Sequence, residues 1–307
     1  MVGRSLVKFF KKKKFGQLIL ISRKKLNLEN FIKVDSFIKK KKPDVIINCA
    51  GKVGGILANS RYPVEFLNVN ISIQANLINS AYKNGIKHFI NLGSSCIYPK
   101  NAKQPIKESY LLSKSLEKTN EAYALAKIMG LKMCEYYNKQ YNTSYFTLMP
   151  CNLYGENDNF NLSEGHFIPA LIKKIIYSEK IKSPFIEILG TGKPKREVMH
   201  VDDLSNAIYF LLKKKIRGDK KILKTLKNTS LINVGSNIEF TIKEFAEKIC
   251  KIENIKRRLF FNKKYPDGTK RKILDIKIIR NLGWKSKLSL NKGLSRTINW
   301  YKENYLN

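Results

Sequence analysis

Asp44-Val45-Ile46-Ile47-Asn48-Cys49-Ala50 is the stretch that decides the fold. Its apolar residues run together instead of alternating with polar ones, and Gly51, Gly54 and Gly55 follow directly. A continuous apolar run of this length is typical of a strand that is buried on both faces of a parallel sheet. The glycines then mark the carboxyl end of the strand, which is the edge where such sheets bind ligands.

Apolar runs alternate with helix-compatible segments on both sides of this strand. We expect further strands at 17–22, 87–92, 145–149, 186–189 and 232–235. We expect helices at 4–11, 31–40, 67–84, 121–141, 167–177, 201–213 and 241–250, and a polar loop at 219–228. The alternation predicts an α/β fold with a doubly wound parallel sheet of the Rossmann type.

The texture of the chain changes after residue 160 and predicts a smaller α/β substrate-binding lobe. Residues 1–160 and about 201–235 would form the dinucleotide-binding domain, and about 161–200 and 236–307 the second lobe. Two helices of these segments begin with capping signals. Asp202 or Asp203 would cap the first, and Thr241 with Glu244 has the spacing of a capping box.

The composition limits the class of protein. The chain has 307 residues, 43% of them hydrophobic, and no apolar run approaches the roughly 20 residues needed to span a bilayer. With no signal-peptide pattern either, we expect a soluble, cytoplasmic protein without a membrane partner. The five cysteines are scattered and form no CxxC pair, and the three histidines lie far apart, so we expect neither disulfides nor a metal site.

The formal charge of +35 would suit a nucleic-acid-binding protein. The lysines are spread along the whole chain, however, and no known nucleic-acid-binding motif accompanies them. We therefore expect no nucleic-acid partner. A basic surface that attracts a phosphate-bearing substrate, or simply a lysine-rich genome, would explain the charge.

Tyr123 and Lys127 stand four residues apart in the helix expected at 121–141, so their side chains share one face. An ammonium group near a phenol favours the phenolate and lowers the phenol's pKa. Such a tyrosine can pass a proton to a sugar oxygen while a hydride reaches the carbon. The spacing alone is weak evidence and more often marks a buried tyrosine and a solvated lysine, so the surrounding motifs must decide.

Six further stretches point in one direction. They are Met1-Val2-Gly3, Lys52-Val53-Gly54-Gly55-Ile56, Leu92-Gly93-Ser94-Ser95-Cys96-Ile97-Tyr98-Pro99, Asn152-Leu153-Tyr154-Gly155, Arg196-Glu197-Val198-Met199-His200-Val201-Asp202-Asp203 and Pro266-Asp267-Gly268-Thr269. Together with the Tyr123 motif, they resemble the extended short-chain dehydrogenase/reductase family over nearly the whole chain. The Lys52 loop and the Ser94–Cys96 turn resemble the branch that acts on GDP-4-dehydro-6-deoxy-D-mannose by 3,5-epimerisation and 4-keto reduction.

The resemblance implies five catalytic residues. Tyr123 would protonate the C4 oxygen, Lys127 would lower the pKa of Tyr123 and bind the nicotinamide ribose, and Ser94 would hydrogen-bond the same C4 oxygen. Cys96 would remove the protons at C3 and C5, and His166 would return a proton on the opposite face. The alternatives are a small core residue for Cys96 and a surface or capping residue for His166.

The cofactor implied is NADP(H). Arg23 would accommodate the 2′-phosphate, because the strand expected at 17–22 ends without an acidic residue. An ordinary surface arginine is the alternative. The other cofactor-binding positions implied are Met1, Val2, Gly3, Leu92, Gly93, Ser94, Ser95, Lys127, Pro150, Cys151, Asn152, Leu153 and His166.

The resemblance also implies a nucleotide-sugar site formed by Lys174, Leu189, Arg196 and Asp267. The Arg196 fork suits a diphosphate, and Asp267 suits ribose hydroxyls. Relatives form homodimers, often through the helices around the tyrosine, so a homodimer is expected. His200, Asp202 and Asp203 are expected to be mainly structural, as the start and cap of a helix.

The sequence departs from the family pattern at its start. The family begins with a strand and GxxGxxG, whereas only the final glycine, Gly3, is present here. We therefore expect a truncated first strand, an unpaired slot in the middle of the sheet, weak stability and poor cofactor affinity. Either the start codon is misassigned or the chain is a truncated relative. Rival functions are an NAD-dependent sugar-nucleotide 4-epimerase or dehydratase, and a basic binding protein on an inactive scaffold.

Overall fold

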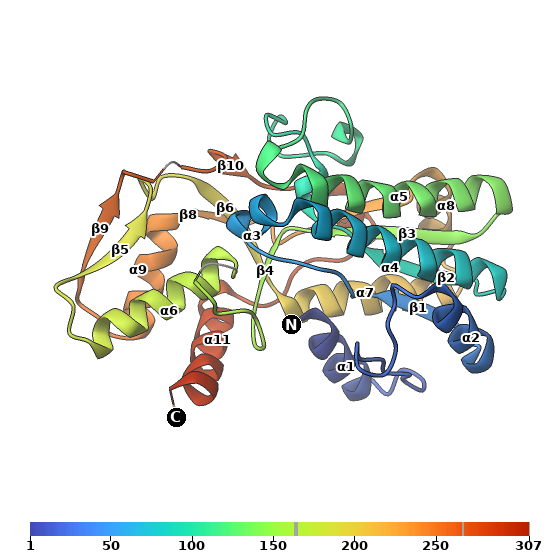
Figure 1. Cartoon of the computed structure of the whole chain (residues 1–307), viewed down its shortest axis with the longest axis horizontal. Coiled ribbons are helices and arrows are strands. Elements are labelled where there is room, and N and C mark those ends of the chain that lie inside the picture. The colour runs from blue at the N-terminus through green and yellow to red at the C-terminus, as the bar shows by residue number, and fades with distance from the viewer. Residues whose placement is uncertain (163–164, 266, 307) are drawn as a thin grey trace.

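The computed structural model describes residues 1–162, 165–265 and 267–306 and has two lobes that lie side by side along its long axis (Figure 1). A parallel sheet with helices on both sides forms the larger lobe. Short strands and three helices form the smaller one. Pro266, part of a motif quoted above, lies outside the described residues.

The sheet of the large lobe contains four parallel strands in the order β1-β2-β3-β7. They are β1 (Val45–Asn48), β2 (His88–Leu92), β3 (Ser144–Pro150) and β7 (Leu231–Val234). The continuous apolar runs predicted all four, and the parallel register confirms the expected α/β class. Because the strands are parallel, all their carboxyl ends lie at one edge of the sheet.

Helices cover both faces of this sheet (Figure 1). One side carries α4 (Pro63–Lys83) and α5 (Glu121–Tyr141), and the other carries α1 (Val2–Lys12) and α7 (Val201–Ile216). Shorter elements complete the lobe: α2 (Phe31–Lys41), α3 (Ile56–Arg61), α8 (Lys220–Asn228), α10 (Lys277–Asn281) and the 3-10 turns η1 (Ser95–Ile97), η2 (Glu108–Tyr110) and η3 (Lys118–Asn120).

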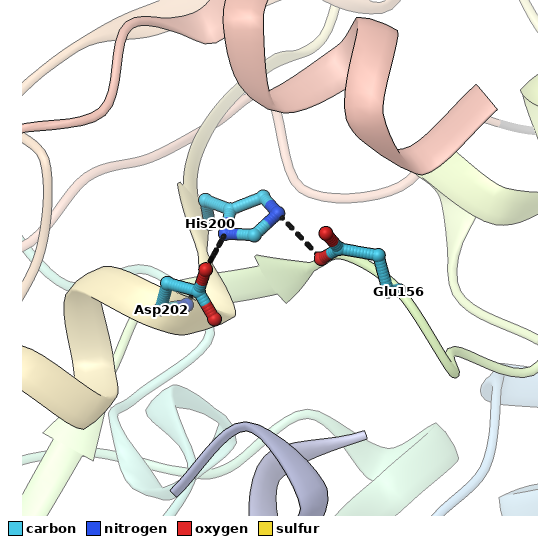
Figure 2. A group of neighbouring side chains, drawn as sticks. All are labelled: Glu156, His200 and Asp202. Carbon is cyan, nitrogen blue, oxygen red and sulfur yellow. Dashed lines mark hydrogen bonds and ion pairs between the residues drawn. The ribbon is translucent and has the colours of Figure 1, made fainter. Parts of the chain in front are cut away.

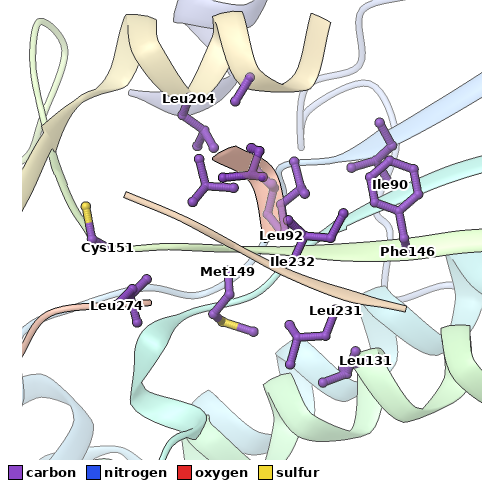
Figure 3. Close-up of a cluster of buried hydrophobic side chains, with 14 of the residues drawn as sticks. Ile90, Leu92, Leu131, Phe146, Met149, Cys151, Leu204, Leu231, Ile232 and Leu274 are labelled. Atoms are coloured by element: carbon purple, nitrogen blue, oxygen red, sulfur yellow. The ribbon is translucent and has the colours of Figure 1, made fainter. Parts of the chain in front are cut away.

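The main core lies between the sheet and these helices. Figure 3 shows Ile90, Phe146 and Ile232 on the side of the sheet that faces Leu204 of α7, and Met149 and Leu231 on the side that faces Leu131 of α5. Since every strand is apolar on both faces, helices must cover both sides, and this burial is the main force that stabilises the lobe.

The small lobe is built from two groups of strands and three helices. One sheet holds β4 (Asn152–Tyr154), β6 (Lys195–His200), β8 (Glu239–Thr241) and β10 (Arg271–Lys272), and a separate pair holds β5 (Phe185–Leu189) and β9 (Arg258–Asn262). The helices are α6 (Phe167–Lys180), α9 (Ile242–Ile252) and α11 (Leu290–Tyr305). The lobe has its own apolar cluster, whereas buried residues from Leu274 to Trp284 join the core of the large lobe.

The prediction of a buried strand at 17–22 was wrong. These residues form no regular secondary structure and pair with no strand, and Ile19, Leu20 and Ile21 are 40%, 51% and 41% exposed. A strand forms only where a neighbouring strand pairs with it. Here the ladder ends at β1, which is the edge strand, so the described sheet has an open edge beside Val45–Asn48 instead of the slot expected in its middle.

Two helix predictions also need correction. Residues 220–228 form α8, capped by the Asp219 carboxylate, although a loop was expected there. Ile222 and Leu226 are four residues apart and buried on one face, a pattern that the many lysines obscured. At α7, His200 is the N-cap in place of Asp202 or Asp203, whereas the Thr241–Glu244 capping box is confirmed.

No described helix is both long and apolar enough to cross a bilayer.

Substitutions at Leu20 and Ile90 test the position of residues 17–22. Ile90 is fully buried in the centre of the sheet, so Ile90→Ala should lower the free energy of unfolding by about 2–5 kcal/mol. Leu20 is half exposed, so Leu20→Ala should change it by less than about 0.5 kcal/mol. Urea titration measures both values. An equal loss for the two variants would place residues 17–22 in the core.

Candidate active site

The end of β2 carries the first group of predicted site residues. Leu92 is the last residue of the strand, Gly93 follows, and η1 then presents Ser94 and Cys96 at the carboxyl edge of the sheet. A Cβ on Gly93 would lie 2.3 Å from the Cε atom of Met149 on β3. Glycine is therefore needed for the loop to lie this close to the neighbouring strand.

Helix α5 brings Tyr123 and Lys127 over the same strand end. The Lys127 Nζ donates a hydrogen bond of 3.0 Å to the Leu92 carbonyl oxygen and lies 5.7 Å from the centroid of the Tyr123 ring. Both side chains are buried, at 4% and 8% exposure. Ala124 and Ala126 have no exposed surface, and their small side chains allow the helix to approach the sheet closely.

Burial sets the protonation of Tyr123. It raises the pKa of the phenol well above its usual value, and nearby Cys96 raises it further, while a hydrogen bond with Ser94 lowers it. We had expected Lys127 to lower this pKa. The opposite direction results because the ring is removed from water, and removal from water disfavours the phenolate. Tyr123 is therefore a neutral phenol that can donate a proton.

The same environment keeps Cys96 protonated. Burial raises the pKa of its thiol, against four opposing influences: the Lys272 charge, a hydrogen bond with Ser94, the Lys127 charge and a hydrogen bond with the backbone of Cys96. Lys272 was missed in the sequence, because it looked like one of several basic residues in a run. Only the pairing of β10 with β6, which the sequence does not reveal, brings it close to the thiol.

Lys127 provides a test of whether a nicotinamide dinucleotide fits. Burial lowers the pKa of its ammonium to about 8, against the opposing effects of Cys96 and Cys49. No ion pair of the described residues gives it a carboxylate partner. A Cβ on Gly51 would lie 2.6 Å from Asn70 Oδ1, which has no hydrogen-bond partner, and 3.5 Å from Lys127 Nζ. An unused acceptor and a cation that both lie beside Gly51 are the donor and acceptor types that could bond ribose hydroxyl groups.

Other predicted cofactor residues surround this group. Pro150 and Cys151 end β3, where the Cys151 N–H bonds the Val234 carbonyl, and Asn152 and Leu153 continue into β4. Ser95 is buried in η1. Met1 and Val2 open α1, and Gly3 faces Cys49 at the end of β1.

Arg23 is not brought into this group. Its side chain is 84% exposed and lies 3.3 Å from the Glu29 carboxylate, as an ordinary surface arginine would. Residues 17–22 form no strand, so the sheet does not fix the position of Arg23.

His166 is the N-cap residue of α6 and is exposed. It lies close enough to Asp158 for an electrostatic interaction with that carboxyl group. No contact between the described residues joins His166 to Tyr123 or Cys96.

The predicted nucleotide-sugar residues form a second group in the small lobe. Arg196 Nη1 donates a 2.6 Å hydrogen bond to the Thr269 carbonyl, and the Thr191 N–H donates to Asp267 at 2.9 Å. Burial lowers the pKa of Arg196, and the Asp267 charge opposes this shift. Lys174 Nζ lies 3.9 Å from Glu187, and Leu189, at the end of β5, is exposed.

Lys272 links the two groups. It pairs in register with Arg196, and burial and the Arg196 charge both lower its pKa, whereas Cys96 raises it. Two cations, Arg196 and Lys272, therefore lie between the expected diphosphate site and the thiol of Cys96. This arrangement suits an anionic substrate that reaches from one lobe to the other.

A third cluster joins the lobes behind the site (Figure 2). His200 Nδ1 accepts the Asp202 N–H at 3.2 Å, so the imidazole proton is left on Nε2, which lies 3.1 Å from Glu156. The three side chains could offer ligands to a metal ion. Arg296 of α11, however, already bridges Glu156 and Asp202 at 2.5 Å and 2.7 Å. The cluster is therefore an ion network.

The fold and the Ser94–Tyr123–Lys127 group define the class of protein: a Rossmann-type oxidoreductase that uses a nicotinamide nucleotide. The model of the NAD dependent epimerase/dehydratase family matches residues 1–226. The chain belongs to this family.

Named relatives extend over the whole chain. A putative GDP-L-fucose synthase 2 of Arabidopsis thaliana is 43% identical over 99% of this chain and 89% of its own length. The GDP-L-fucose synthase of Escherichia coli K12 is 41% identical over 99% and 94%. A crystal structure of a GDP-D-glycero-L-gluco-heptose synthase from Campylobacter jejuni in the presence of NADPH is 33% identical, covers 98% and 95%, and superposes with a TM-score of 0.87.

The ion network should make stability depend on pH. Burial would raise the pKa of Glu156, but hydrogen bonds with His200 and Arg296 outweigh it and lower this pKa to about 2. A carboxyl group with a lowered pKa adds stability above its unfolded pKa and loses it as the pH falls through the folded value. Arg296→Met should therefore cost about 2 kcal/mol at pH 7 and less near pH 2.

Urea unfolding across this pH range measures the effect. Arg280→Met is the control, because Arg280 is exposed on α10, and it should change stability by less than about 0.5 kcal/mol. A loss for Arg296→Met that stays constant from pH 7 to pH 2 would contradict the role given to Glu156.

Proposed function

We propose that the chain converts GDP-4-dehydro-6-deoxy-D-mannose to GDP-L-fucose, by 3,5-epimerisation followed by NADPH-dependent reduction of the 4-keto group. The observation that carries this proposal is the burial of Cys96, Tyr123 and Lys127 in one group, with the partly buried Ser94 beside them. The identity to GDP-L-fucose synthases over nearly the full chain supports the choice of substrate. A thiol beside the tyrosine is the group that a reductase alone would not need.

Cys96 is the proposed base of the epimerisation. A proton next to a ketone is acidic enough to be removed when the carbonyl oxygen is hydrogen-bonded, and Ser94 and Tyr123 are the hydroxyl donors beside Cys96. The thiol must first become a thiolate, which Lys272 and Lys127 favour. The thiolate takes the proton from C3 or C5, and a proton from the opposite face restores the carbon.

His166 is the proposed source of that second proton. It is exposed at the start of α6, where its imidazole can exchange protons with solvent, and it lies beside Asp158. Since no described contact places it at the thiol, this role requires the substrate, reaching across from Cys96, to bring the two groups to opposite faces of one sugar ring.

Tyr123 is the proposed acid of the reduction. NADPH, when bound, supplies the hydride to C4. The neutral Tyr123 phenol gives its proton to the C4 oxygen, and the resulting phenolate is stabilised by the ammonium of Lys127. Lys127 and the unpaired Asn70 Oδ1 would bond the hydroxyl groups of the nicotinamide ribose. The Campylobacter jejuni relative, described in the presence of NADPH, supports this cofactor over NADH.

The nucleotide part of the substrate is assigned to the small lobe. Arg196 and Lys174 would bind the diphosphate, Asp267 would accept hydrogen bonds from ribose hydroxyls, and the exposed Leu189 would contact the base. Thr191 and Thr269 already hold Asp267 and Arg196 in place, so the site is partly formed before the substrate binds.

We further propose a cytoplasmic homodimer. All five cysteines are free, as expected in a reducing compartment. Apolar residues are exposed on the outer surface of two neighbouring helices, with Val64 and Tyr82 on α4 and Leu125, Tyr136 and Tyr141 on α5. Two copies of such a surface would bury one another in a symmetric contact.

Cys96→Ser tests the epimerase assignment. Serine cannot form an anion at neutral pH, so the variant should make no GDP-L-fucose from the keto-sugar and NADPH, while its affinity for NADPH stays within about twofold. NADPH absorbance at 340 nm measures cofactor consumption, chromatography identifies the product, and fluorescence titration measures the affinity for NADPH.

Cys134→Ser is the matched control, because Cys134 is buried in α5 away from this group, and its turnover should stay near that of the wild type. A Cys96→Ser enzyme with full fucose formation would refute the epimerase role. A wild-type protein that consumes no NADPH with this sugar, but converts another sugar nucleotide with NAD, would favour the 4-epimerase instead.

A further inference from the structure

Glu197 is a fully buried carboxylate that the proposed reaction does not use. It follows Arg196 on β6, and because strand side chains alternate, its side chain points to the face opposite that of Arg196. Its two oxygens accept backbone N–H groups from two different segments: Asn237 donates at 2.7 Å, and Leu274 donates at 2.9 Å. The side chain therefore joins the loop after β7 to the segment that follows β10.

Both segments carry or support residues of the active site. The Leu274 segment continues directly from Lys272, the cation beside Cys96. The Asn237 loop follows Val234, whose carbonyl oxygen accepts the Cys151 N–H. The Glu197 carbonyl oxygen itself accepts a 3.0 Å hydrogen bond from the side chain of Asn152, one of the expected cofactor residues. Glu197 thus contacts β4 and the segments that follow β7 and β10.

Gly235 shows how closely the carboxylate is held. A Cβ at this position would lie 2.3 Å from one oxygen of Glu197 and 3.0 Å from the other. Any larger residue would push the carboxylate out of its position. The end of β7 is therefore shaped around this side chain.

We propose that Glu197 is a positioning residue for nucleotide-sugar binding, holding Arg196 and Lys272 in register with Asn152 through its hydrogen bonds to Asn237 and Leu274. This inference rests on the proposed function for the identity of the ligand. Glu197 touches neither substrate nor cofactor, and acts by fixing the strands that do.

The role depends on the negative charge of Glu197, because only an ionised carboxylate accepts on both oxygens. Burial raises the pKa of Glu197 to about 7, while the backbone N–H groups lower it, and Glu239 of β8 raises it further. Cys151 faces it from the link before β4. Arg271 of β10 is held by Glu239 at 2.6 Å, and Lys272 is directed to Cys96 and Arg196, so neither cation neutralises Glu197.

Binding of the nucleotide sugar should weaken as the pH falls. Above about pH 7 the carboxylate is ionised and accepts both hydrogen bonds, and below it a proton removes one acceptor. Calorimetric titration with GDP-mannose, an unreactive nucleotide sugar, should show binding about tenfold weaker at pH 6 than at pH 8, since the ionised fraction of a carboxyl group with a pKa of about 7 falls about tenfold over this range. The wild-type profile needs no substitution, so it stands even if a variant fails to fold.

Three variants complete the test. Glu197→Gln should bind GDP-mannose about tenfold more weakly than the wild type at pH 8, with no change between pH 6 and pH 8. Gly235→Ala should weaken binding at pH 8 to a similar degree, because it displaces the carboxylate without removing it. Glu239→Gln should move the midpoint of the wild-type profile to lower pH.

Wild-type affinity and an unchanged pH profile in Glu197→Gln would overturn the positioning role. Binding by the wild type that does not vary with pH would also overturn it. The titration requires no turnover, so its result is separate from that of the proposed function. A protein that binds GDP-mannose with this pH dependence but does not convert the keto-sugar would retain the role of Glu197 and lose the proposed reaction.

Discussion

The constraint on which the site depends is burial of the Lys127 ammonium, for which no residue that the structure describes supplies a carboxylate partner. Its hydrogen bond to the Leu92 carbonyl fixes α5 over the end of β2, and Tyr123, one turn earlier, is thereby brought over Ser94 and Cys96. A buried cation is unfavourable unless something compensates it. A ligand whose oxygen atoms accept hydrogen bonds from the Lys127 ammonium would supply this compensation.

Burial also determines the protonation states of the site residues before a ligand binds. It keeps Tyr123 and Cys96 protonated and lowers the pKa of Lys127 to about 8. The reacting groups therefore begin neutral, and charge develops only when a ketone is present to accept a hydrogen bond. On the other side of the thiol, Lys272 and Arg196 extend positive charge toward the small lobe. The reacting sugar and its diphosphate would lie along one continuous line of donors.

Much of this could be predicted from local sequence pattern. The helix Glu121–Tyr141 has the limits that were expected, and the four sheet strands were found from their apolar runs. The prediction of a strand at 17–22 was wrong because an apolar run forms a strand only if a neighbouring strand pairs with it. Lys272 and Glu197 could not be assigned roles, because the pairing of β6 with β8 and β10 joins segments distant in sequence. For Arg23 and His166, the described contacts give a surface arginine and an N-cap residue, and their proposed roles depend on bound ligands.

The central claim is that one buried group epimerises two carbons and reduces a third in the same sugar. The direct test is conversion of unlabelled GDP-4-dehydro-6-deoxy-D-mannose in D₂O with unlabelled NADPH, followed by NMR of the product. The account predicts GDP-L-fucose with deuterium at C3 and C5, because Cys96 removes the original protons and His166, which exchanges with solvent, returns deuterons, and with protium at C4. A reduced product that keeps protium at C3 and C5 would contradict it.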